Sequence, residues 1–181
     1  MNMSKSASRD APMKQEEFRK IGNDVIIFDQ AKIVNKGAIS IDDHTRIDDF
    51  TFINGGQETV IGKYVHIASF VSIIGGGKLF VGDYVGISAG ARIITGTDRY
   101  EGGSRMSAAA PREQRNPLVS FVKIEKDASI GTNAVIYPGV TIREGAVLGI
   151  NSLALSDLEP WGVYFGSPCK KIGTRPKVKF G

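Results

Sequence analysis

Aliphatic residues recur at every sixth position over most of this chain. The spacing runs in triplets that restart every twenty residues up to Ile93 and then continues without a break from Ile124. A period of six fits neither the 3.6 of an α-helix nor the 2 of an ordinary strand, so it predicts a short strand followed by a sharp corner. The positions are Ile21, Ile27, Ile33, Ile41, Ile47, Ile53, Ile61, Ile67, Ile73, Val81, Ile87, Ile93, Ile124, Ile130, Ile136, Ile142, Leu148 and Ala154.

A second set of positions supports the same fold. Small or β-branched residues recur four positions after the aliphatic ones, at Val65, Val85, Ala91, Ala134, Val140 and Ala146. Three such units would close one triangular coil, and stacked coils would bury a continuous aliphatic column. Each corner needs a residue near the left-handed region, which favours Gly or Asn. We therefore expect an all-β fold, a parallel β-helix of about six coils.

Four segments follow from this pattern. Residues 1–20 are polar, and residues 15–20 are expected to form a short capping helix after a disordered stretch. Residues 21–156 form the predicted β-helix, interrupted by a loop at 97–122 whose length favours a functional role. Residues 157–181 leave the repeat as a C-terminal extension.

Composition narrows the possible classes. The 22 glycines agree with many tight turns, and the single cysteine, Cys169, excludes an internal disulfide and a cysteine-cluster metal site. No apolar run is long enough for a membrane span or a secretory signal, so we expect a cytoplasmic protein without membrane insertion. The net charge is +4, and residues 170–181 contain five Lys and Arg residues and no acidic residue. This basic end is either solvated or binds a phosphorylated ligand; no motif for nucleic acid accompanies it.

The repeats, the interrupting loop and the closing segment EPWGVYFGSPCKKI together resemble the hexapeptide-repeat acyltransferases. The nearest branch is similar to the galactoside and maltose O-acetyltransferases, whose coils end in a P-W-x-V-x-x-G-x-P-A-K-x-I pattern. Here Cys169 replaces the alanine and is expected to be a packing residue. The resemblance implies a left-handed β-helix, a homotrimer with active sites between subunits, and acetyl-CoA as co-substrate without a metal.

The resemblance also implies where acetyl-CoA would lie. Its pantetheine arm would run beside the backbone of the last coils, around Gly131, Gly149 and Ala154. Its phosphates would contact the basic residues Lys170, Lys171 and Arg175, as phosphates favour Lys and Arg.

Direct acyl transfer needs a general base. In the resembled enzymes a histidine stands where the long loop leaves the coils, and here that position holds Asp98. Asp98 could act only if it were buried, or could orient another base. His66 is the preferred candidate because it should face outward next to glycine at position 86 and serine at position 129 on neighbouring coils. The alternative for His66 is a structural hydrogen bond at a subunit interface.

Other residues near the loop have candidate roles. Arg92, Arg99 and Tyr100 are the predicted acceptor-binding residues, and Tyr100 offers a face for a sugar. The same residues would otherwise anchor the loop. His44 is expected at an exposed corner, and Trp161 is expected to pack across the end of the prism.

The sequence thus favours acetyl-CoA-dependent O-acetylation of a sugar or a surface-polysaccharide precursor. The alternative is N-acetylation of a nucleotide-linked amino sugar. A γ-type carbonic anhydrase would need three zinc-binding histidines per site, and the chain contains two histidines. A non-enzymatic scaffold remains open because Asp98 replaces the usual histidine. The acceptor, the choice between oxygen and nitrogen, and the acyl group are left open at this stage.

Overall fold

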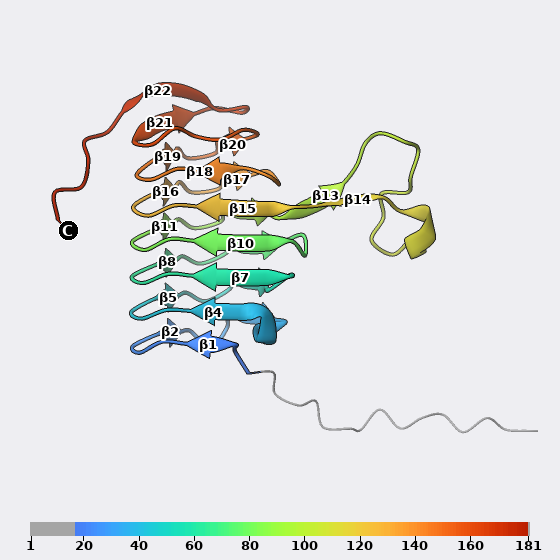
Figure 1. Cartoon of the computed structure of the whole chain (residues 1–181), viewed down its shortest axis with the longest axis horizontal. Coiled ribbons are helices and arrows are strands. Elements are labelled where there is room, and N and C mark those ends of the chain that lie inside the picture. Colours follow the sequence, from blue (N-terminus) through green and yellow to red (C-terminus); the bar gives the residue numbers. More distant parts are fainter. Residues whose placement is uncertain (1–16, 181) are drawn as a thin grey trace, which may run out of the picture.

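The computed structural model describes residues 17–180 as a parallel β-solenoid with three sheets, one on each side (Figure 1). Sheet A contains β1 (Lys20–Ile21), β4 (Ile39–Ile41), β7 (Glu58–Ile61), β10 (Lys78–Val81), β15 (Phe121–Ile124) and β18 (Thr141–Ile142). Sheet B contains β2 (Ile26–Ile27), β5 (Arg46–Ile47), β8 (His66–Ile67), β11 (Gly86–Ile87), β16 (Ser129–Ile130), β19 (Val147–Leu148), β21 (Gly162–Phe165) and β22 (Lys170–Thr174). Sheet C contains β3 (Lys32–Val34), β6 (Phe52–Asn54), β9 (Ser72–Ile74), β12 (Arg92–Ile94), β17 (Val135–Ile136) and β20 (Leu153–Ala154).

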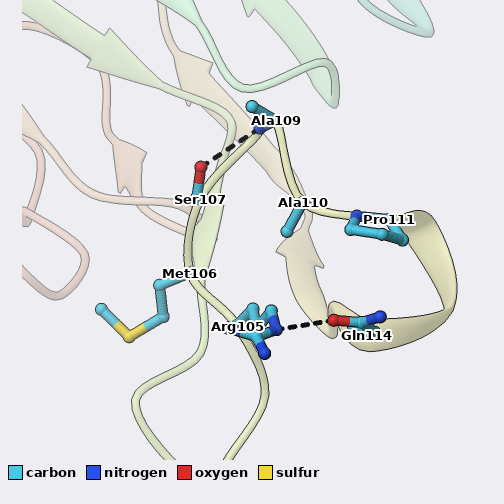
Figure 2. Close-up of a pocket in the computed structure, with 7 residues that line it drawn as sticks. All are labelled: Arg105, Met106, Ser107, Ala109, Ala110, Pro111 and Gln114. Carbon is cyan, nitrogen blue, oxygen red and sulfur yellow. Dashed lines mark hydrogen bonds between the residues drawn. The ribbon is translucent and has the colours of Figure 1, made fainter.

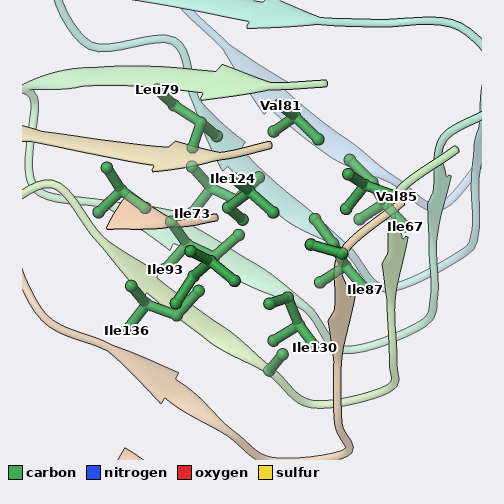
Figure 3. Close-up of a cluster of buried hydrophobic side chains, with 14 of the residues drawn as sticks. Ile67, Ile73, Leu79, Val81, Val85, Ile87, Ile93, Ile124, Ile130 and Ile136 are labelled. Carbon is green, nitrogen blue, oxygen red and sulfur yellow. The ribbon is translucent and has the colours of Figure 1, made fainter. Parts of the chain in front are cut away.

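The six-residue spacing produces the vertical register that the sequence predicts. Ile47 pairs with Ile67, Ile67 with Ile87, and Ile87 with Ile130 along sheet B. From Ile41 onward every predicted inward aliphatic residue is buried. Figure 3 shows part of this set, from Ile67 to Ile136, gathered inside the coils. Because each coil covers the next, the core is one continuous column.

The first coil is less covered than the others. Ile21 is 52% exposed, and Ile27 and Ile33 are partly buried. Within residues 17–180 these three side chains have a neighbouring coil on one side only. Position in the stack, rather than residue type, therefore determines their exposure.

The corners adopt the expected left-handed backbone. Gly90, Gly139, Asn133 and Asn151 are of the expected types, whereas aromatic residues stand at other corners. His44, Tyr64 and Tyr84 have φ values of 59°, 56° and 59° at the corner between sheets A and B. Their rings stack, with centroids 4.7 Å apart for the first pair and 5.0 Å for the second. Stacking of aromatic rings stabilises the column and offsets the strain of a side chain at positive φ.

The predicted loop contains a projecting antiparallel hairpin. β13 (Gly96–Asp98) pairs with β14 (Pro117–Val119), and a 3₁₀ turn, η2 (Arg112–Gln114), lies near the tip. A second 3₁₀ turn, η1 (Lys36–Ala38), lies between sheets C and A. Figure 1 shows the hairpin extending sideways from the prism, at the edge where β12 leads into β15. The chain thus leaves the core and returns to it at one place.

The solenoid continues past the predicted end at residue 156. Leu158 forms a bridge with Ile142, and Tyr164 of β21 pairs with Leu148, so a seventh coil begins. Strand β22 then folds back antiparallel to β21 and covers this end (Figure 1). Trp161 has the expected packing role. Its ring lies against the corner at Gly145, where an added Cβ would be 2.3 Å from the ring.

At the other end, the expected capping helix is not found in the described part of its range. Residues 17–19 have no helical structure, and Lys20 already belongs to β1. Residues 15 and 16 lie outside the described residues. Among residues 17–180, no helix is long and apolar enough to cross a membrane.

Candidate functional site

An ion pair lies at the neck of the hairpin. Asp98 ends β13, and its carboxylate is 3.6 Å from the guanidinium of Arg115, which precedes β14. About a quarter of each side chain is exposed. A cleft of about 170 Å³ contains both residues together with Gly75, Gly96 and Thr97. The neck therefore holds a carboxylate that is partly shielded from solvent and close to the Arg115 guanidinium.

A larger cleft adjoins this neck and shares Thr97 with it. Its volume is about 630 Å³, and its walls are Ile94, Thr97, Tyr100, Tyr137, Leu153 and Leu155. Ile94 and Leu153 belong to the outer side of sheet C, whereas Tyr100 belongs to the hairpin. An apolar cleft with a few polar groups is the usual form of a small-molecule site. The larger cleft can therefore accept the apolar part of a ligand whose polar end extends past Thr97 toward Asp98.

A third hollow, of about 530 Å³, lies in the hairpin itself (Figure 2). The Nε of Arg105 donates a hydrogen bond to Gln114 across it at 2.6 Å, and the Ser107 hydroxyl accepts one from the backbone of Ala109. These bonds fix the shape of the hairpin tip. Arg105 is the one titratable side chain among its lining residues, so this hollow has less catalytic potential than the neck.

His66 forms a separate cluster on sheet B. Its Nε2 is 2.9 Å from Asp48, which also accepts a hydrogen bond from Arg46 at 2.7 Å. Burial raises the pKa of Asp48, but the hydrogen bonds from Arg46 and His66 outweigh burial and hold that pKa below its usual value. A Cβ added at Gly86, the next position above His66, would meet no atom within 4 Å. The expected outward orientation beside open space is confirmed, as half of the imidazole side chain is exposed.

The two predicted catalytic residues do not meet within one chain. His66 lies in the middle of sheet B. Asp98 lies on the hairpin that leaves the edge between sheets C and A. A single chain therefore offers two separate candidate bases rather than one site that contains both.

The predicted acceptor-binding residues have different surroundings. The guanidinium of Arg92 donates to the backbone carbonyls of Phe70, at 2.8 Å, and Gly90, so it supports a corner. Arg99 is exposed on the hairpin. Tyr100 lines the larger cleft, although 72% of it is exposed. Of the three, Tyr100 has the position that best fits contact with a ligand.

The small residues predicted to adjoin the pantetheine arm are closely packed. A Cβ at Gly131 would lie 2.6 Å from the backbone of Gly149, and a Cβ at Gly149 would lie 2.4 Å from the Phe165 ring. Ala154 is fully buried, so only its backbone could contact a ligand. Close approach of successive coils accounts for these residues, and their role toward a cofactor stays a prediction.

The predicted phosphate-binding residues are partly engaged elsewhere. Lys171 forms an ion pair with Glu159, and this hydrogen bond raises the pKa of the Lys171 ammonium. Arg175 donates to the carbonyls of Gly145 and Asp127 at 2.8 and 2.6 Å and stacks on Trp161. Lys170 is exposed on β22. It is the residue of the three with most freedom to contact a phosphate.

The structure also bears on metals and on the cysteine. In the part of the chain between residues 17 and 180, no cluster of three His, Cys, Asp or Glu side chains could hold a metal ion. Cys169 packs against the core, and burial raises the pKa of its thiol. A raised thiol pKa disfavours the reactive thiolate, which fits a packing role.

Three features of these sites are not found by sequence reasoning. Arg115 lies seventeen residues after Asp98 in an irregular segment, and no spacing connects the two. Asp48 is one of four closely spaced aspartates, Asp42, Asp43, Asp48 and Asp49, and the sequence does not single it out. Leu158 and Tyr164 keep the spacing of six, but a four-residue step after Ala154 hides their continuity with the repeat.

The fold and the sequence comparisons together define the class. The chain is 35% identical over 166 residues to the dTDP-4-amino-4,6-dideoxy-D-glucose acyltransferase of Escherichia coli, covering 91% of this chain and 86% of that protein. The chain therefore belongs to the hexapeptide-repeat, left-handed β-helix acyltransferases, and it is an acyltransferase that uses acyl-CoA. No protein-family model matches the chain.

Solved structures give the same class. AntD, an N-acyltransferase from Bacillus cereus, superimposes with a TM-score of 0.82 at 32% identity, over 88% of this chain and 86% of that one. That structure, of a serine variant, holds dTDP-4-amino-4,6-dideoxyglucose and coenzyme A. Another AntD structure, with a TM-score of 0.81 at 33% identity over 88% of this chain and 84% of that one, holds dTDP and 3-hydroxybutyryl-CoA. The resemblance to galactoside O-acetyltransferases is thus corrected toward the dTDP-amino-sugar N-acyltransferases.

Proposed function

We propose that this protein transfers an acyl group from acyl-CoA to the amino group of a dTDP-linked 4-amino-4,6-dideoxy sugar. The supporting observation is the similarity of about nine-tenths of the chain to relatives that act on or bind this sugar nucleotide. The N-acylation alternative thereby replaces O-acetylation as the main hypothesis. The acyl group need not be acetyl, since a longer acyl-CoA is bound in one relative.

Asp98 is the proposed general base. The carboxylate accepts a proton from the sugar ammonium or from the tetrahedral adduct, and the thiolate of CoA departs as the new amide forms. Asp98 lines the smaller cleft at the hairpin neck, and its neighbour Thr97 lines both clefts. Variants of AntD replace a serine and an aspartate that are ten positions apart in that protein, and Ser88 and Asp98 have the same separation here.

The larger cleft is the proposed site for the acyl group and the adjoining sugar. Its walls of Ile94, Leu153 and Leu155 suit an acyl chain, and Tyr100 offers its ring to the sugar. Thr97 lines both this cleft and the smaller one that contains Asp98. A ligand in the larger cleft would therefore have its reacting end near the proposed base.

A homotrimer remains part of the proposal. In a trimer with sites between subunits, sheet B of one subunit would lie opposite the hairpin of the next. Ser88 and His66 occupy neighbouring coils of that sheet, and the floor between them is open at Gly86. Such an arrangement gives His66 a route to the acceptor and keeps it as the competing candidate for the base.

The test is a thiol-release assay with purified full-length protein. The panel pairs acetyl-CoA and 3-hydroxybutyryl-CoA with dTDP-4-amino-4,6-dideoxyglucose, its 4-hydroxy analogue and a free galactoside. We expect turnover only when the acceptor is dTDP-4-amino-4,6-dideoxyglucose, and none with the 4-hydroxy analogue or the galactoside. Turnover with the galactoside but not with the amino sugar would contradict the proposal.

Two variants separate the candidate bases in the same assay. Asp98→Asn should lower kcat by about 10²-fold or more, the usual contribution of a general base. His66→Ala should change kcat by less than about threefold, because its imidazole is then a structural partner of Asp48. The reverse result would transfer the role of base to His66.

A further inference from the structure

We propose that Arg115 is a positioning residue that holds the Asp98 carboxylate in its reactive orientation. This inference rests on the proposed function, because it assigns Arg115 a role through the base. Nothing in the spacing of the chain connects the two residues; the fold of the hairpin alone brings them together.

The hairpin register explains how they meet. Asp98 is opposite Pro117 in the antiparallel pair, and Arg115 stands two residues before Pro117. Arg115 follows η2 in extended backbone, with φ −117° and ψ 148°, so it begins the straight segment that leads into β14. The side chain therefore reaches back across the neck to the strand that carries Asp98.

The guanidinium is held from more than one side. One Nη donates to the backbone carbonyl of Ala108 at 3.3 Å, and the other lies 3.6 Å from the Asp98 carboxylate. The Ala108 contact fixes the guanidinium to the opposite part of the hairpin. At 3.6 Å the contact is an ion pair rather than a hydrogen bond, and the fixed charge attracts the Asp98 carboxylate toward its own side of the neck.

The pair differs from the ion pairs on the solenoid surface. Arg115 is 23% exposed and Asp98 27%, whereas Arg143 and Asp157, for example, are 51% and 44% exposed. The Arg115 Nε is also buried without a hydrogen-bond partner. A buried, unpaired donor lowers stability, which argues against a purely stabilising purpose for this side chain. A 3.6 Å separation leaves the carboxylate oxygens available to accept a proton or a hydrogen bond from substrate.

The experiment is a double-mutant cycle on kcat with the full-length protein. Arg115→Gln should lower kcat by about 10- to 100-fold, the effect of a misplaced catalytic group, and should change both KM values by less than about twofold. In the Asp98→Asn background the same substitution should change kcat by less than about twofold, because its target is absent. Arg115→Lys keeps the charge and should recover part of the lost kcat.

Arg112→Gln is the matched control, since it removes a positive charge from the same hairpin at an exposed site. It should leave kcat, KM and the melting temperature unchanged. Circular dichroism of Arg115→Gln and Arg115→Lys checks that both variants are folded; loss of fold in both would show a structural role and overturn the inference.

The outcomes separate the two proposals. If Asp98→Asn is fully active, the assignment of the base fails. If Asp98→Asn is slow but Arg115→Gln is not, only the positioning role fails. Equal losses from Arg115→Gln in the presence and absence of Asp98, or a loss confined to KM, would also overturn the positioning role.

Discussion

At the scale of single residues, two hydrogen bonds hold the Asp48 carboxylate in place at the surface of the solenoid. Its side chain is 17% exposed, and it accepts hydrogen bonds from Arg46 and His66 on the same sheet. The pKa of Asp48 in the folded protein therefore lies below its ordinary value of 3.8. Because the carboxyl pKa of Asp48 is lower in the folded than in the unfolded protein, Asp48 stabilises the fold at pH values above the unfolded pKa. This contribution disappears as the pH falls through the folded pKa.

Asp48→Asn should therefore lower the free energy of unfolding by about 1 kcal/mol at pH 7, the size of one charge-assisted interaction near the surface. The gap between variant and wild type should close as the pH falls from about 5 to about 2. Urea denaturation followed by circular dichroism at several pH values measures both quantities. Asp29→Asn, at an exposed site one coil below, is the control, and a gap that persists at low pH would contradict the argument.

The same scale shows what the sequence could and could not predict about the site. The outward position of His66 follows from its place one residue before the inward Ile67. Its partner Asp48 could not be chosen over Asp42, Asp43 or Asp49, since the sequence places all four in polar stretches between the inward isoleucines. Arg115 escaped prediction because an irregular hairpin has no period from which a contact can be inferred.

At the scale of elements, the corner at Gly131 leaves no room for a side chain between successive coils. A Cβ at Gly131 would lie 2.6 Å from the backbone carbonyl carbon of Gly149 and from the amide of Ile150. Backbone cannot move aside as a side chain can, so the coils would have to separate. Glycine at this corner therefore has a packing reason that does not involve acyl-CoA.

Gly131→Ala should lower the free energy of unfolding by about 1–3 kcal/mol, as overpacking usually does. Gly86→Ala is the matched control, because a Cβ there would meet nothing within 4 Å and the residue lies in strand β11. Guanidinium denaturation of the two variants compares them directly. If the two variants were equally stable, the coils could separate at Gly131 without loss of stability, and the packing argument would be wrong.

Strands and corners also differ in how well the sequence predicted them. The strands were predicted because their inward side chains repeat. The corners were predicted in backbone, and in residue type only where Gly or Asn stands, as at Gly139 and Asn133. Aromatic stacking lets Tyr64 and Tyr84 occupy left-handed positions that glycine usually fills. The hairpin β13–β14 was expected only as a long loop, since its two short strands have no repeating pattern to identify them.

At the scale of the whole molecule, the solenoid is a nearly one-dimensional stack. Each coil contacts its neighbours above and below, so stability should depend on where in the stack a contact is lost. Ile87 is 1% exposed and has coils on both sides, whereas Ile33 lies in the first coil and is only partly buried. Both are isoleucines at the inward position of a six-residue unit, Ile33 on sheet C and Ile87 on sheet B, and they differ in how many coils cover them.

Ile87→Ala should lower the free energy of unfolding by about 2–5 kcal/mol, because it opens a cavity that coils on both sides enclose. Ile33→Ala should lower it by about 1–2 kcal/mol, since the removed atoms were already partly in water. Hydrogen exchange gives the sharper distinction. The Ile33 variant should speed exchange in β1–β3 and leave β10–β17 protected, whereas the Ile87 variant should weaken protection on both sides of β11. If hydrogen exchange became faster in all strands of the Ile33 variant, the stack would unfold as one unit. The stability of a coil would then not depend on its position in the stack.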